Sequence, residues 1–96
     1  MFKMEWTHQA LDRIESISDY ISLDSPVAAK KWAESIFEKE KLLSSNPRIG
    51  RKVPEYGDDH VREVFVGNYR LVYKIKEKLI SVLTVKNCKE KRSAAH

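Results

Sequence analysis

The chain has 96 residues, of which 42% are apolar and 33% charged, and its formal net charge is +4. With only three glycines and three prolines, this composition excludes collagen-like and low-complexity chains and fits one soluble globular domain with a modest core. The longest apolar stretch, residues 79–85, is far shorter than the roughly 20 residues of a membrane-spanning helix, and the first residues lack a secretory signal pattern.

The first predicted elements are a short strand and a helix. Apolar residues alternate with charged ones over residues 2–6, and a period of two is typical of a strand with one buried face. Thr7 is a good helix N-cap. Apolar residues then recur at spacings of three and four over residues 10–21, which predicts an amphipathic helix.

A second helix is predicted after a break at residues 24–26. Ser25 is a good N-cap, and Pro26 fits the first helical position because its missing N–H would be unpaired there anyway. The helical spacing of apolar residues continues to Leu43. Asn46-Pro47 ends the helix, since the residue before a proline is disfavoured in the helical region.

The rest of the chain is predicted to form a loop and three strands. Residues 47–60 are rich in Gly, Pro and Asp, which is typical of a loop. The strands follow at residues 61–66, 69–75 and 79–85. Gly67-Asn68 forms a two-residue hairpin turn, because Gly permits the positive φ that such a turn requires.

These elements define the predicted fold class. Sequential strands with short turns make an antiparallel meander, and helices that precede strands indicate an α+β fold. We expect one domain over residues 1–96, in which an N-terminal helical hairpin packs on a small antiparallel β-sheet in the order β-α-α-β-β-β. Residues 86–96 form a basic tail.

Basic residues concentrate in the second half of the chain. Residues 47–96 carry twelve basic and six acidic side chains, whereas residues 1–46 carry six basic and eight acidic ones. This asymmetry indicates a polyanionic or acidic partner, and the alternative is a solvated surface that keeps the protein soluble. The tail contributes Lys86, Lys89, Lys91 and Arg92.

The residues alone indicate no catalytic or metal-binding constellation. The three histidines are far apart in sequence and have no partner at metal-ligand spacing. Asp58-Asp59 lacks a further ligand nearby. The single cysteine, Cys88, excludes an internal disulfide and fits a reducing cytoplasm. We therefore expect no metal, no cofactor and no catalytic residue, in a small basic domain that binds a partner.

Six short motifs follow one another along the chain. The helical half contains Ala10-x-x-x-Ile14-x-x-Ile17-x-x-Tyr20-Ile21, Ser25-Pro26-x-Ala28-Ala29 and Leu43-x-x-x-Pro47-x-x-Gly50-Arg51. The strands contain Val61-Arg62-Glu63-Val64, Asn68-Tyr69-Arg70-Leu71-Val72-Tyr73 and Ile80-Ser81-Val82-Leu83-Thr84-Val85. In this order they resemble the ParE branch of the RelE/ParE toxin superfamily. The resemblance implies a bacterial toxin with a helical hairpin on a compact sheet, neutralised by a cognate ParD-like antitoxin in a toxin–antitoxin hetero-oligomer.

Two activities occur in this superfamily. ParE-type toxins poison DNA gyrase, and RelE-type toxins cut messenger RNA on the ribosome. The RelE type uses an Arg before its Gly-Tyr-Arg segment, and an Arg and a Tyr after the last strand, to stabilise charge and move protons. Phe65, Cys88 and Ala94 occupy these positions here. The resemblance therefore favours gyrase inhibition by binding alone. A ribosome-dependent mRNA endonuclease is the alternative, because Lys86 or Lys89 could replace the missing cations. Lys86-Asn87 also stand where the family often has a His.

Candidate binding residues follow from the resemblance and the charge pattern. The target-binding candidates are Arg62, Tyr69, Arg70, Lys86, Lys89, Lys91 and Arg92. The antitoxin-binding candidates are Leu11, Ile14, Trp32, Ile36 and Arg51, in a groove between hairpin and sheet. The structural alternatives are a pair between Arg70 and Glu63 across the hairpin, packing of Tyr69, and a loop-shaping role for Gly50-Arg51.

A third possibility is a harmless relic or a structural partner domain. Such a protein would leave growth unaffected when it is expressed alone. A neighbouring short reading frame that encodes an acidic, partly disordered protein would favour the toxin.

Overall fold

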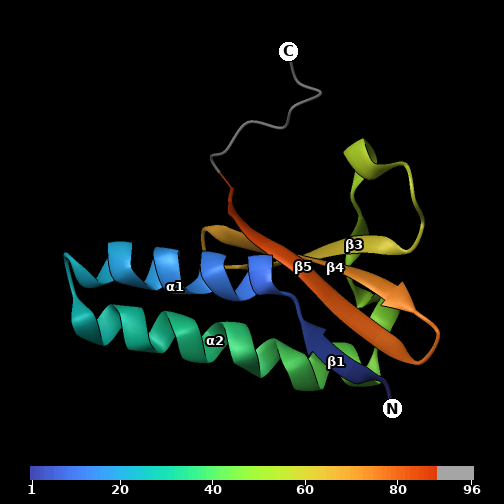
Figure 1. Cartoon of the computed structure of the whole chain (residues 1–96), viewed down its shortest axis with the longest axis horizontal. Helices are drawn as coiled ribbons and strands as arrows, with labels where there is room; N and C mark the ends of the chain where they lie inside the picture. The colour runs from blue at the N-terminus through green and yellow to red at the C-terminus, as the bar shows by residue number, and fades with distance from the viewer. Residues whose placement is uncertain (89–96) are drawn as a thin grey trace.

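The computed structural model describes residues 1–88 as two layers (Figure 1). One layer is a hairpin of two helices, α1 (His8–Ser22) and α2 (Pro26–Ser45). The other is a five-stranded sheet of β1 (Lys3–Trp6), β2 (Arg51–Lys52), β3 (Val61–Val66), β4 (Tyr69–Lys76) and β5 (Leu79–Asn87). Two short 3-10 helices, η1 (Pro47–Ile49) and η2 (Pro54–Tyr56), flank β2. The predicted α+β class and element order are confirmed.

Both helices begin at the predicted caps. The side-chain oxygen of Thr7 accepts a hydrogen bond from the N–H of Ala10, and that of Ser25 accepts one from the N–H of Ala28, each at 3.1 Å. These bonds satisfy N–H groups that have no partner within the helix. The turn between the helices lies at the end of the hairpin away from the sheet (Figure 1).

The sheet is mixed rather than purely antiparallel, which corrects the predicted architecture. Its strand order is β1-β5-β4-β3-β2. β3, β4 and β5 form the predicted antiparallel meander, but β1 pairs parallel with β5, from Lys3 opposite Leu79 to Trp6 opposite Val82. Parallel neighbours need a long crossover, and here the helical hairpin and the remaining strands lie between them in the chain.

The main core lies between the helices and one face of the sheet. Its buried members are Ala10, Ile14 and Ile17 of α1, Ile36 and Leu43 of α2, and Val66, Leu71, Tyr73, Ile75, Ile80, Val82 and Val85 of the sheet. Because side chains alternate along a strand, residues between these positions point to the opposite face. The helix-covered face therefore leaves a second face of the sheet for other contacts.

Residues 47–60 are more ordered than the predicted loop. β2 pairs with β3, so that Arg51 lies opposite Glu63. The hydroxyl of buried Tyr73 donates to the carbonyl of Pro47 (2.6 Å) and accepts from the N–H of Gly50 (3.0 Å). Burial raises the pKa of Tyr73, outweighing opposing effects of Gly50 and a nearby arginine, so the hydroxyl keeps its proton. A Cβ on Gly50 would lie 2.6 Å from that hydroxyl oxygen. The predicted loop-shaping role of Gly50 is confirmed.

The last strand extends further than predicted, whereas the turn before β4 is as predicted. Gly67 has φ +60°, as the predicted hairpin turn requires. β5 continues to Asn87, so Lys86 lies in a strand and not in a tail. In the part of the chain that the structure describes, no helix is long and apolar enough to span a membrane.

Candidate partner-binding surfaces

The face of the sheet opposite the helices, called the open face below, carries both charged and apolar side chains. Phe65 of β3 lies opposite Arg70 of β4, which in turn lies opposite Lys86 of β5. Val53, from the segment between β2 and β3, packs with buried Val61 and Val72 as a second small apolar cluster. The open face is thus partly covered by the chain itself.

Four charged residues form a cluster on the open face, called the charge cluster below: Arg51, Glu55, Glu63 and Arg70. The Glu63 carboxylate accepts hydrogen bonds from Arg51 Nε (2.6 Å) and Arg70 Nη1 (2.7 Å). Arg70 Nη1 also lies 3.8 Å from Glu55 Oε2. The Glu63 side chain is fully buried, and that of Arg70 is 3% exposed. Charge-assisted bonds to both arginines offset the cost of burying this carboxylate.

The ionisation of Glu63 follows from this balance. Burial is the largest single influence and favours the neutral acid, but the hydrogen bonds and charges of Arg70 and Arg51 together outweigh it. The pKa of Glu63 is therefore lower than that of a free glutamate. Because Glu63 stays ionised at neutral pH, Arg70 remains engaged with it. The pair between these two residues that the sequence suggested is confirmed.

Arg51 is the accessible member of this pair of arginines. Its side chain is 56% exposed, and its guanidinium lies 5.1 Å from the centroid of the Phe65 ring. That distance is within the range of a cation–π contact. Phe65 is itself 49% exposed. The edge of the charge cluster therefore presents a cation and an aromatic ring side by side.

Within residues 1–88, the target-binding candidates do not all lie in one patch. Arg62 donates to the carbonyls of Asp59 (3.2 Å) and Gly50 (3.0 Å), and so holds the segment before β3. The ring of half-buried Tyr69 meets the edge of Trp32, with centroids 5.2 Å apart. By strand alternation, Arg62 and Tyr69 belong to the helix-covered face, whereas Arg70 belongs to the open face.

The basic end of the chain is described only in part. Lys86 is half-buried and lies opposite Arg70 on β5. Lys89, Lys91 and Arg92, three further target-binding candidates, lie outside residues 1–88. Cys88 is an exposed free thiol, in agreement with the sequence interpretation.

The antitoxin-binding candidates separate into buried and exposed residues. Ile14 and Ile36 are 5% and 0% exposed and belong to the main core, which leaves them almost no side-chain surface for a partner in this conformation. An apolar stripe on a helix does not reveal whether the sheet or a partner covers it. Trp32 is half-buried against Tyr69, whereas Leu11 is 45% exposed and the Arg51 side chain 56%.

A groove lies between α2 and the end of β3, and none of the five antitoxin-binding candidates lines it. It encloses about 350 Å³. Its lining comes from α2 (Ser35, Glu38, Lys39 and Leu42) and from the end of β3 with its turn (Phe65, Val66 and Gly67). β2 pairs only with Arg62 and Glu63, so it does not cover this end of β3. The groove, called the hairpin groove below, presents polar and apolar side chains in similar measure, and its Phe65 ring lies beside Arg51.

Two features of these surfaces escaped the sequence analysis. Glu55 belongs to the charge cluster, although its segment was predicted to be a loop. Phe65 was considered only as a replacement for the catalytic Arg of RelE-type toxins, and not as a binding residue. A signal for the cluster was present, because Glu63 is in phase with buried Val61 in β3, where an apolar residue is expected. Within residues 1–88, no three His, Cys, Asp or Glu side chains are placed to hold a metal ion.

Comparisons with known proteins agree with this architecture. Residues 4–92 match the family model of the ParE toxin of the type II toxin–antitoxin system parDE. The chromosomal ParDE system of P. aeruginosa contains a similar structure, with a TM-score of 0.71 and 28% identity over 91% of this chain and 96% of that chain. The toxin–antitoxin complex RelBE2 of Mycobacterium tuberculosis shares the fold, with a TM-score of 0.65 and 19% identity over 90% and 96% of the two chains. Comparison with curated proteins gives no match. The chain belongs to the family of ParE toxins of type II toxin–antitoxin systems.

Proposed function

We propose that this ParE-type toxin inhibits DNA gyrase in the cytoplasm by binding to it, without bond chemistry of its own. A ParD-like antitoxin neutralises it, as the relative from the ParDE system suggests. Inhibition of this kind needs a surface that grips a macromolecule. It does not need a general base or a cation at a scissile phosphate.

The state of Arg70 is the observation that carries this proposal. A nuclease of the RelE type needs cationic side chains that reach the phosphate in the transition state. Arg70 is 3% exposed and donates to Glu63 at 2.7 Å, so its charge is already neutralised within the fold. The neighbouring position on β3 holds Phe65, which offers an apolar ring and no charge. This arrangement supports binding over RNA cleavage.

A gyrase assay tests the proposal directly. Purified toxin is added to gyrase and plasmid DNA, and supercoiling and cleaved DNA are measured. We expect lost supercoiling or stabilised cleavage complexes. Unaffected gyrase, together with transcripts cut only in the presence of ribosomes, would transfer the assignment to the runner-up mRNA endonuclease. The position of Lys86 opposite Arg70 is the feature that favours that alternative.

For neutralisation, we propose that an amphipathic helix or strand of the antitoxin occupies the hairpin groove. Leu42 and Phe65 supply apolar surface, and an amphipathic peptide in such a groove gains affinity from a few buried anchors. Exposed Arg51 beside Phe65 offers a partner for acidic antitoxin residues, which would also speed association.

Phe65→Ala tests the groove, with Phe37→Ala as the matched control. The two rings are similarly exposed, at 49% and 44%, but Phe37 packs against Trp6 and does not line the groove. We expect Phe65→Ala to weaken antitoxin binding by about 10–100-fold in calorimetry, and Phe37→Ala to leave it nearly unchanged. Equal effects of the two changes would place the antitoxin elsewhere.

A further inference from the structure

A cleft of about 990 Å³ lies at the end of the sheet where β4 turns into β5. Four separate segments line it: Phe2, residues 45–49, the pair Asp58 and His60, and residues 74–78. None of these residues lines the hairpin groove or belongs to the charge cluster. This end cleft is therefore a surface distinct from both sites considered above.

Hydrogen bonds between separate segments hold the walls of the end cleft. The N–H of Phe2 donates to the carbonyl of Ser44 (3.1 Å), and the Ser44 hydroxyl donates to the carbonyl of Phe2 (2.6 Å). On the opposite side, the N–H of Ile75 donates to the carbonyl of His60 (2.8 Å). The cleft is thus built on the ends of α2, β1, β3 and β4, and is already formed in the free chain.

Four apolar residues contribute to the lining of the end cleft and are called its apolar floor below. They are Phe2, Pro47, Ile49 and Ile75. Ile75 is 8% exposed, whereas Ile49 is 54% exposed and so offers apolar surface to a ligand. The volume lies at the upper end of the range for ligand pockets, which are typically apolar with a few polar groups at fixed positions.

The rim of the end cleft has an excess of positive charge. Asp58 contacts Lys74 at 3.5 Å and His60 at 3.3 Å. The backbone N–H of His60 is the main cause of the lowered pKa of Asp58, so Asp58 stays ionised and offsets the charge of Lys74. The remaining cations of the lining are Arg48, Lys76 and Lys78, against one acid, Glu77.

The turn between β4 and β5 holds one of these cations at a conformational cost. Lys78 has φ +55°, and it is the non-glycine residue with positive φ within residues 1–88. A left-handed conformation is unfavourable for a residue with a Cβ, and Gly or Asn would be the usual choice. A lysine at this position is explained if its charge at the mouth of the cleft contributes to binding.

We propose that the end cleft binds an acidic peptide segment of a partner protein, with an aliphatic or aromatic anchor on the apolar floor and carboxylates at Arg48, Lys76 and Lys78. Charge complementarity selects an acidic ligand, and the apolar floor selects one with an apolar anchor. Single-stranded nucleic acid fits less well, because its bases need aromatic stacking platforms. Two aromatic rings line the cleft, those of half-buried Phe2 and of His60, and the His60 imidazole is already in contact with Asp58. This inference does not depend on gyrase as the target.

Fluorescence anisotropy with synthetic probes tests the proposal. The probe is a short labelled peptide in which glutamates flank a Leu-Phe anchor. Its two controls carry glutamine in place of glutamate, or serine in place of the anchor. We expect saturable binding of the probe, and at least about tenfold weaker binding of each control, which corresponds to about 1.4 kcal/mol.

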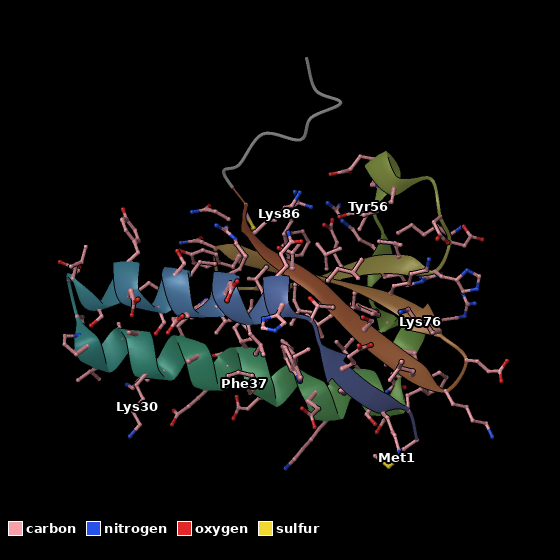
Figure 2. The ribbon with its side chains drawn as sticks, in the orientation of Figure 1. Met1, Lys30, Phe37, Tyr56, Lys76 and Lys86 are labelled. Carbon is pink, nitrogen blue, oxygen red and sulfur yellow. The ribbon has the colours of Figure 1, made fainter. Side chains whose placement is uncertain are left out.

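Charge-reversal variants test whether the probe binds at the end cleft. Lys76→Glu combined with Lys78→Glu is compared with Lys30→Glu combined with Lys31→Glu. Both pairs are exposed and change the net charge equally, but Lys30 lies on α2, far from Lys76 (Figure 2). We expect the first variant to weaken probe binding at least tenfold and the second less than about twofold. Because all four lysines are exposed, both variants should fold, and circular dichroism checks this.

Four results would overturn the proposal. One is equal weakening by the two variants, which would indicate general electrostatic attraction. Another is equal binding of the anchorless peptide, which would remove the role of the apolar floor. The third is absence of probe binding. The fourth is that a single-stranded oligonucleotide of equal charge binds more tightly than the probe, and that Lys76→Glu combined with Lys78→Glu abolishes this binding.

Discussion

The helix-covered face of the sheet buries Leu71, Ile80 and Val82 against aliphatic side chains of the two helices, whereas the open face buries Glu63 between two arginines. Both faces contain side chains with almost no exposure. On the covered face the gain comes from apolar surface removed from water. On the open face each buried charge depends on a specific partner at hydrogen-bond distance.

The two faces therefore have different roles in this small domain. Apolar contacts are non-directional, so the covered face can lose part of a side chain and still hold together. A buried ion pair fails once one partner is removed, because the other charge is left without compensation. We infer that the helix-covered face supplies most of the stability, while the charge cluster fixes β2, β3 and β4 relative to one another and shapes the surface beside the hairpin groove.

Glu63→Gln is expected to have the largest effect. The change removes the negative charge and keeps the volume. Among residues 1–88, the charged partner that then remains beside buried Arg70 is Glu55, 3.8 Å away. Removal of one partner from a buried pair costs about 3–5 kcal/mol, and the nearby Glu55 places the expected loss at about 3 kcal/mol. Urea denaturation of the purified protein measures it. A loss below about 1 kcal/mol would show that the cluster behaves like a surface pair.

The pH dependence of the unfolding free energy also tests the role of the buried Glu63 charge, and the expected change is smaller. The pKa of Glu63 is lower in the folded chain than its ordinary value of 4.5. Its contribution is therefore complete above that ordinary value, and it is lost as the pH falls through the folded pKa. The gap in unfolding free energy between wild type and Glu63→Gln should narrow below about pH 4.5. Asp58 and Asp59, whose pKa values are also lowered, act equally in both proteins. A gap that widens in acid would contradict the assignment.

Gly50→Ala tests the place where the two faces meet. The new Cβ would lie 2.6 Å from the hydroxyl oxygen of Tyr73, which belongs to the covered face, and 2.7 Å from the backbone oxygen of Glu63. Because neither neighbour is the flexible end of a long side chain, β2 must shift, at a cost of about 1–3 kcal/mol. Thermal unfolding measures the loss. An unchanged melting temperature would mean that β2 is free to move without affecting either face.

The sequence predicted the covered face better than the open one. Alternation in β3 to β5 and the caps at Thr7 and Ser25 depend on nearest neighbours, so they can be recognised locally. The parallel pairing of β1 with β5 could not be recognised, because alternation does not identify a strand's partner. β2 has two residues, too few for any pattern.

The candidate sites show the same limit. The contact between Glu63 and Arg70 was predictable, because one tight turn joins their strands. Its burial was not, since it depends on Val53 and Glu55 from a segment without regular spacing. A groove between hairpin and sheet was expected, but none of the residues predicted for it lines the hairpin groove, because that lining depends on how β3 lies against α2. The end cleft combines four segments far apart in sequence, and composition gave no sign of it.

Ile36→Val probes the covered face with a smaller change. Ile36 is fully buried in the core, and the substitution removes one methylene group. Such a change typically costs about 0.5–1.5 kcal/mol, since the surrounding side chains relax only partly. Urea denaturation should show this loss with an unchanged slope. A loss as large as that of Glu63→Gln would mean that the covered face is as intolerant of change as the open face.

Asp59→Asn is expected to have the smallest effect, and it isolates burial as the cause of the difference. Lys52 Nζ lies 2.8 Å from Asp59 Oδ1, a distance close to those within the charge cluster. Both side chains are more than half exposed, so water and salt screen the pair. We expect no measurable shift of the urea midpoint at moderate ionic strength. If this exposed pair instead matched Glu63→Gln in cost, hydrogen-bond distance alone would govern the ion pairs of this fold, and desolvation would have no part in the contrast between its two faces.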